Sequence, residues 1–180
     1  MTKEATGADI VTGTLEEART WIGKKTPVKF NETDVNRPMI QFYAAAVEDA
    51  NPSYWDEEYA GNAHGGIISP PGMLMAWSMT PDWNPMRPKS QKSQSTFDLP
   101  LPGTTLINVS TESEFFRPMR IGEILNSDSE IVSISDEKKT RLGIGHFIVT
   151  QATYRSGAGE IVATNTNTMF RYIAHGENHS

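Results

Sequence analysis

Apolar and polar positions in the first third of the chain follow the spacing of short amphipathic helices. A capping box over Thr14-Leu15-Glu16-Glu17 begins the first helix, which we expect over 15–22. A second apolar stripe predicts a helix over 37–48, with Asp34 or Asn36 as its cap. The members of this stripe are Ile40, Tyr43, Ala44 and Val47.

The second half of the chain changes to the period-two spacing of strands. We expect four long strands, over residues 104–117, 121–135, 140–155 and 161–173. In the last of them Ile161 and Ala163 alternate with Val162 and with threonines, as in a half-buried strand. A short helical turn over 56–60 and a first strand over 26–30 are expected earlier in the chain.

Two segments between these halves have their own character. The run from Gly72 to Met79 follows two prolines and is apolar on nearly all faces, which is typical of a buried helix. Residues 84–102 are rich in Pro, Ser, Lys and Gln, and so long a connection is either functional or disordered. Helices followed by antiparallel strands indicate an α+β fold. We expect a single domain over 14–174, a flexible N-terminus over 1–13 and a tail over 175–180.

Composition narrows the class of protein. The chain has 180 residues, with 16 basic and 22 acidic side chains and a net charge of −6, which argues against binding to nucleic acid. It has no cysteine, so disulfides and thiolate metal sites are excluded. Its four histidines lack metal-ligand spacing, so we expect no metal. No apolar run is long enough to span a bilayer and the N-terminus lacks a signal pattern, so we expect a cytoplasmic protein without membrane contact.

One short stretch carries a motif. Residues 48–54, Glu-Asp-Ala-Asn-Pro-Ser-Tyr, resemble the Gly-Asp-x-Asn-Pro-x-His motif of the MaoC-like hotdog hydratase family. Asp49, Asn51 and Pro52 match it, whereas Glu48 stands in place of the glycine and Tyr54 in place of the catalytic histidine.

Other stretches extend this resemblance from about residue 14 to 173. They are Asn36-Arg37-Pro38-Met39-Ile40, Gly66-Ile67-Ile68-Ser69-Pro70-Pro71, Met75-Ala76-Trp77-Ser78-Met79 and the turn Phe116-Arg117-Pro118-Met119-Arg120-Ile121-Gly122-Glu123. Together they are similar to the MaoC N-terminal-like domain, as in the larger subunit of bacterial steroid side-chain enoyl-CoA hydratases, without its zinc-ribbon and OB-fold extension. The resemblance implies a long curved antiparallel sheet around a central helix that begins near Gly72.

The resemblance also implies hydration of a 2-enoyl-CoA or the reverse dehydration. Such a reaction needs a base for water and N–H donors for the thioester oxygen. Asp49 is then the candidate catalytic carboxylate, although an aspartate before Asn-Pro is also a common turn residue. Tyr54 is a poor base, because an unperturbed phenol has a pKa near 10. Gly72 is the candidate oxyanion donor by family position, or else a glycine selected for close packing.

Further candidates concern the substrate. We expect contacts with the acyl-CoA from Asn51, Tyr54, Met73, Trp77, Arg87 and Lys89. Arg87 and Lys89 could bind CoA phosphates or belong to a solvated loop. Met73 and Trp77 could line a pocket or fill the core. His64 is interpreted as a loop histidine with a satisfied hydrogen bond. No cofactor is implied, since the CoA thioester is the substrate.

The absence of the motif histidine suggests that two subunits share the active site. We expect the non-catalytic half of a hydratase, which shapes the pocket for a bulky acyl chain beside a shorter MaoC-like partner subunit that carries the Asp and His. Whether the chain is an enzyme by itself stays open at this point. The alternatives are a homodimeric hotdog protein that binds an acyl-CoA or another hydrophobic ligand without turnover, and a hotdog thioesterase.

Overall fold

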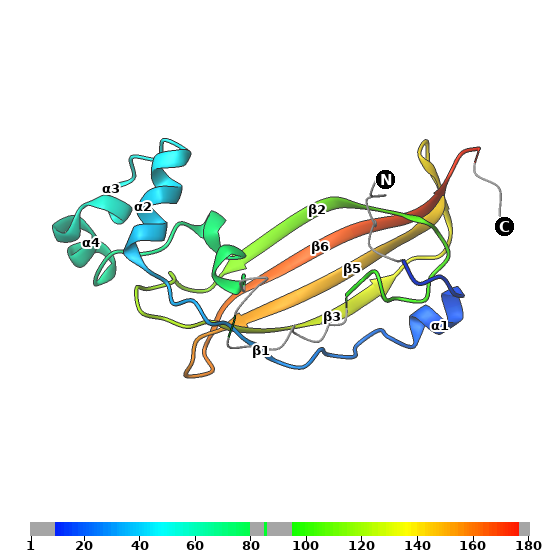
Figure 1. Ribbon diagram of the computed structural model, residues 1–180, viewed down its shortest axis with the longest axis horizontal. Helices are drawn as coiled ribbons and strands as arrows, with labels where there is room; N and C mark the ends of the chain where they lie inside the picture. The colour runs from blue at the N-terminus through cyan, green and yellow to red at the C-terminus, as the bar shows by residue number, and fades with distance from the viewer. Residues whose placement is uncertain (1–9, 80–84, 86–94, 177–180) are drawn as a thin grey trace.

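One antiparallel sheet forms the body of the molecule (Figure 1). The computed structural model describes residues 10–79, 85 and 95–176. The long strands are β2 (Thr105–Phe115), β3 (Asn126–Ile134), β5 (Gly143–Arg155) and β6 (Ile161–Ala174), and the short ones are β1 (Lys29–Phe30) and β4 (Lys138–Lys139). Their order is β1-β3-β5-β6-β2, with β4 paired to β5. The four predicted long strands are therefore confirmed, and β2 lies at one edge of the sheet.

In the described part of the chain, four α-helices lie at the two ends of this sheet: α1 (Leu15–Arg19), α2 (Arg37–Ala46), α3 (Pro52–Trp55) and α4 (Glu57–His64). In Figure 1, α1 lies near one end of the sheet and α2, α3 and α4 gather at the other. The predicted capping box of α1 is present, but this helix ends before residue 22, because the N–H groups of Thr20, Trp21 and Ile22 bind carbonyls three residues back in place of four. Asn36 caps α2, since its Oδ1 accepts the Met39 N–H at 3.1 Å.

The expected central helix is the main correction to the prediction. From Pro71 the chain forms two turns of 3-10 helix, η1 (Pro71–Met73) and η2 (Ala76–Ser78), in place of one continuous α-helix. Pro70 and Pro71 supply no N–H groups at its start, and the Met73 and Leu74 N–H groups bind carbonyls three residues back, which is the hydrogen-bond pattern of a 3-10 turn. The two turns nevertheless bury Met73 and Trp77 in the core, and the antiparallel sheet with its separate helices confirms the predicted α+β class.

Buried apolar side chains form two clusters. The larger joins η1 and η2 to α2, α3 and β6, and it includes Ile40, Tyr54, Trp77 and Val162. The smaller lies toward α1 and consists of Ala18, Leu99, Leu101, Ile131, Ile134 and Ile148. Leu99 and Leu101 belong to the long connection, so this part of it is packed against the sheet. No helix within the described residues is long and apolar enough to cross a membrane.

Candidate functional site

The motif at residues 48–54 forms a tight turn between α2 and α3. Glu48 has a φ of 55°, so the left-handed backbone falls at the position where the family motif has glycine. The Asp49 carboxylate accepts the Asn51 N–H at 2.9 Å, and its carbonyl accepts the Trp55 indole N–H at 2.8 Å. Asn51 in turn caps α3, because its Oδ1 accepts the Ser53 N–H at 3.0 Å. Asp49 and Asn51 thus organise the turn itself.

Tyr54, which the motif resemblance aligns with the catalytic histidine of the MaoC-like hydratases, is 5% exposed. Burial raises the pKa of this phenol above its usual value near 10, and the negative charge of Asp49 raises it further. A phenol of this kind stays protonated at neutral pH and cannot take a proton from water. The structural environment therefore strengthens the chemical argument against Tyr54 as a base.

Gly72 lies in η1, against the Tyr43 hydroxyl from α2. A Cβ atom added at Gly72 would come within 2.3 Å of that oxygen, so a side chain here would have to displace the Tyr43 ring. The Met73 and Leu74 N–H groups are bound to the Pro70 and Pro71 carbonyls at 3.0 and 3.1 Å. Since prolines have no N–H, an oxyanion at this turn could use only the Gly72 N–H. The close packing is therefore observed, and the role of the N–H group stays a prediction.

The remaining candidates separate into different environments. Met73 and Trp77 are buried at 3% and 0% exposure, and the Trp77 indole donates to the Ser69 hydroxyl at 2.8 Å. Asp49 faces another space, a groove of about 510 Å³ whose lining includes Trp55 and Asp56 but neither Tyr54 nor Gly72. The structure thus does not place the Asp49 carboxylate and the Gly72 donor around one cavity. Arg87 and Lys89 lie outside the described residues.

A serine–histidine contact is the feature that the sequence did not reveal. His64, the last residue of α4 rather than a loop residue, has its Nε2 3.0 Å from the Ser53 hydroxyl, so its hydrogen bond is satisfied as predicted. Ser53 is only 4% exposed, which denies a substrate carbonyl access to the hydroxyl. No local spacing signals this pair, because the packing of α3 against α4 brings the two residues together.

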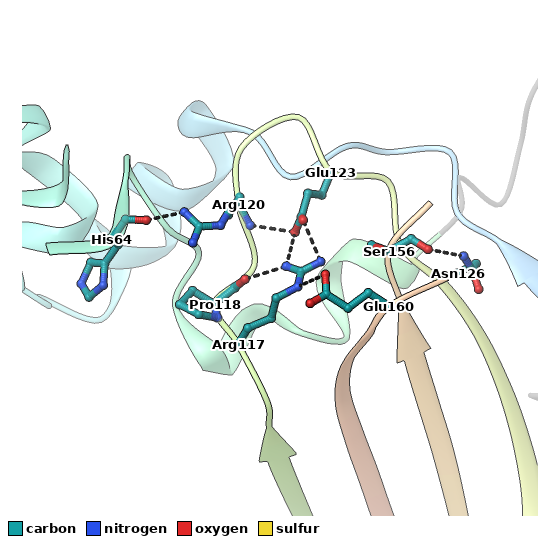
Figure 2. A network of polar contacts seen from close by, with 8 residues as sticks. All are labelled: His64, Arg117, Pro118, Arg120, Glu123, Asn126, Ser156 and Glu160. Atoms are coloured by element: carbon teal, nitrogen blue, oxygen red, sulfur yellow. Dashed lines mark hydrogen bonds and ion pairs between the residues drawn. The ribbon is translucent and has the colours of Figure 1, made fainter. Parts of the chain in front are cut away.

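An arginine network joins the helical end of the molecule to the sheet (Figure 2). In the turn between β2 and β3, the Arg117 guanidinium binds Glu123 at 2.9 Å and Glu160 at 2.8 Å. These carboxylates raise the pKa of Arg117. Arg120 donates its backbone N–H to Glu123 at 2.9 Å and its guanidinium to the His64 carbonyl. The network fixes the end of α4 to the β2–β3 turn and to the β5–β6 hairpin.

The sheet order and the helical segment between α4 and β2 define the class as the hotdog fold, and solved structures agree. The crystal structure of the ChsH1-ChsH2 complex from Mycobacterium tuberculosis matches with a TM-score of 0.72 and 25% identity, over 92% of this chain and 94% of that chain. A structure described as a MaoC-like dehydratase matches with a TM-score of 0.63 and 24% identity, over 87% of this chain and 44% of that chain.

The family itself is defined by sequence. The family described as "FAS1-like, dehydratase domain region" matches residues 20–165, and the chain belongs to this family. It is 34% identical, over 84% of its length, to a probable enoyl-CoA hydratase alpha subunit from Thermomonospora curvata. It is 31% identical, over 73% of its length, to the 3-oxo-4,17-pregnadiene-20-carboxyl-CoA hydratase alpha subunit of Mycobacterium tuberculosis. The chain spans 50% and 43% of these two curated relatives.

Proposed function

We propose that this chain is the pocket-shaping half of an acyl-CoA hydratase/dehydratase and that a MaoC-like partner subunit supplies the catalytic Asp and His. Tyr54 carries the proposal, because a buried phenol with a raised pKa stands where an active hydratase needs its histidine. The environment of Asp49 supports it as well, since this carboxylate is bound to the Asn51 N–H within its own turn.

The chemistry assigns different tasks to the two subunits. The partner's base takes a proton from water, the hydroxyl adds to the β-carbon of the 2-enoyl thioester, and a proton is returned to the α-carbon. Negative charge gathers on the thioester oxygen during this addition and must be held by N–H donors. This chain contributes walls for the acyl group and, through Gly72, one backbone N–H near the interface.

Two features of the chain suit this role. The turns η1 and η2 have three residues each and replace the continuous helix that we expected from Gly72 onward. They leave Met75 and Met79 at 54% and 70% exposure. Methionine adapts to irregular apolar ligands, so these two side chains fit a bulky acyl chain. The two curated relatives are named alpha subunits, which supports a partner subunit for this chain.

Hydration assays test whether the partner subunit supplies the catalytic residues. The chain is co-expressed with a short MaoC-type subunit from a neighbouring gene, and hydration of a 2-enoyl-CoA is measured for the chain alone and for the complex. We expect activity only in the complex. Replacing the partner's motif histidine by alanine should lower kcat by about 100-fold or more, in line with the loss of a general base.

Variants of this chain provide the matched comparison. Tyr54→Phe and Asp49→Asn in the complex should each keep kcat within about threefold and leave the pH profile between pH 6 and 9 unchanged, because neither group exchanges a proton with the substrate. Hydration by the chain alone that disappears in Asp49→Asn would place the active site in this chain and refute the proposal. A stable homodimer that binds acyl-CoA without turnover would favour the binding-protein alternative instead.

A further inference from the structure

A basic pocket lies where the helices meet the β2–β3 turn. It has a volume of about 410 Å³, and its lining includes Arg37, Glu57, Gly65, Gly66, Ile67 and Arg120. These residues come from the start of α2, both ends of α4 and the turn that Figure 2 draws around Arg120. We call this site the Arg37–Arg120 pocket. It shares no lining residue with the groove that Asp49 lines, and through Ile67 it borders the core that contains Tyr54.

The pocket has more positive than negative charge. Arg37 pairs with Glu57, but their side chains are 40% and 71% exposed, so solvent screens this pair. Arg120 gives one guanidinium nitrogen to the His64 carbonyl, a neutral acceptor, and among the described residues no carboxylate lies within ion-pair distance of its guanidinium. Arg117, in the same turn, is by contrast compensated by two carboxylates. Two cations against one anion leave an excess positive charge in a chain with a net charge of −6.

The backbone keeps the pocket open. Gly65 and Gly66 follow α4 with φ values of 79° and 143°, conformations that residues with side chains rarely adopt. A Cβ at Gly66 would meet no atom within 4 Å, so the backbone there borders open space. Toward the described residues, the Arg37 and Arg120 guanidiniums each donate through Nη1, so their other N–H groups can bind a ligand. Guanidinium groups match the oxygen geometry of phosphate and bind it through paired hydrogen bonds.

We infer that the Arg37–Arg120 pocket binds a phosphate group. Two sources share this chemistry: the nucleotide end of CoA, which rests on the proposed function, and free inorganic phosphate. Both place a doubly or singly charged oxyanion between the two guanidiniums, with Glu57 as the competing anion.

Isothermal titration calorimetry of the purified chain, at low ionic strength, tests the site with CoA, 3′-dephospho-CoA and inorganic phosphate. Arg120→Gln and Arg37→Gln should each weaken binding by about three- to tenfold, because each removes one charge-assisted contact. Glu57→Gln should tighten binding by about threefold, since it removes the competing carboxylate. Arg141→Gln, in the turn between β4 and β5 at the opposite end of the sheet, is the control and should bind as the unmodified chain does (Figure 1).

The pattern of affinities decides the inference. Weaker binding of Arg120→Gln together with tighter binding of Glu57→Gln supports the pocket, and a loss of folding cannot imitate the gain. Tighter binding of CoA than of 3′-dephospho-CoA identifies the nucleotide end of CoA as the source of the phosphate. If the arginine variants weaken the binding of inorganic phosphate as much as that of CoA, the ligand is the free ion. Unchanged affinity in both variants, or no binding by the unmodified chain, overturns the inference. Hydration by the complex is measured separately, so the proposed function can fail while phosphate binding persists.

Discussion

Glu48 keeps a left-handed backbone, with a φ of 55°, at the position where the MaoC motif has glycine. A residue with a Cβ atom pays about 1–2 kcal/mol for this conformation, and glycine avoids the cost but loses about 0.5–1 kcal/mol through its freer unfolded chain. We therefore expect Glu48→Gly to raise the free energy of unfolding by about 0.5–1 kcal/mol. Urea denaturation followed by circular dichroism measures the change.

Glu48→Ala is the matched control for this substitution, because it removes the carboxylate but keeps the Cβ atom. We expect its free energy of unfolding to stay within about 0.5 kcal/mol of the unmodified chain. If Glu48→Ala stabilises the protein as much as Glu48→Gly, the effect comes from the charge and the backbone explanation is wrong.

What the sequence reveals at the scale of residues depends on how local the interaction is. The Asp49–Asn51 turn could be predicted, because both partners and Pro52 are adjacent in the chain and each has a strong turn preference. The contact between Gly72 and the Tyr43 hydroxyl, and the bond between Ser53 and His64, could not. Each of these joins separate elements, so no spacing pattern encodes it.

The same distinction between local and distant interactions holds for the helices. The capping box of α1 and the Asn36 cap of α2 were readable, since a helix start is decided within four residues. The ends of helices were harder to predict, and α3 was missed because the Asn51-Pro52 pair, interpreted as part of the motif, also begins a helix. The run after Pro71 is as apolar as a buried helix, yet its apolar residues do not determine which type of helix it forms. Its burial was predicted and its helical type was not.

Arg171 on β6 connects three segments that are distant in sequence. Its side chain is fully buried, and its guanidinium donates to the carbonyls of Gly103 at 3.0 Å, of Leu99 at 2.7 Å and of Val11. Burial lowers its pKa to about 10, so it remains charged at neutral pH. One fork-shaped cation thereby holds the N-terminal segment and the end of the long connection against the sheet.

Arg171→Met should lower the free energy of unfolding by about 3–5 kcal/mol, because the buried carbonyls of Gly103 and Leu99 and the half-buried carbonyl of Val11 lose their donor. Arg171→Lys should cost about 2–3 kcal/mol, since a single ammonium cannot reach all three acceptors. Guanidinium chloride denaturation measures both values, and hydrogen exchange at residues 95–103 reports the local effect. Arg141→Met, at an exposed site, should change the stability little. If Arg171→Met changes the free energy of unfolding as little as Arg141→Met does, the hydrogen bonds of Arg171 contribute no stability.

At the scale of the whole molecule, the two edges of the sheet differ. On one side, β1 and isolated bridges from Ile22 and Lys25 cover part of β3. On the other, β2 pairs with β6 alone among the described strands and is exposed over most of its length. An exposed strand edge is a site for pairing with another chain. We therefore expect the partner subunit to join the sheet along β2.

Ser113 allows this edge to be tested without breaking the fold. The Phe116 N–H donates to the Val162 carbonyl at 2.9 Å, so by the alternation of an antiparallel pair the Ser113 N–H points away from β6. Ser113→Pro removes that outward donor and leaves the β2–β6 hydrogen bonds intact. Ser113→Ala keeps the N–H group but loses the bond from the Asn165 amide to the Ser113 hydroxyl, 2.8 Å in length, so it is the matched control.

Light scattering after size exclusion gives the mass of each form, alone and co-expressed with the short MaoC-type subunit. The unmodified chain and Ser113→Ala should elute as an assembly, whereas Ser113→Pro should elute at the mass of a single chain with its circular dichroism spectrum unchanged. Because the proposed acyl-CoA site needs both halves, Ser113→Pro should also abolish hydration while Ser113→Ala retains it. A folded Ser113→Pro chain that still assembles would mean that the partner binds elsewhere, and the open edge of β2 would then need another explanation.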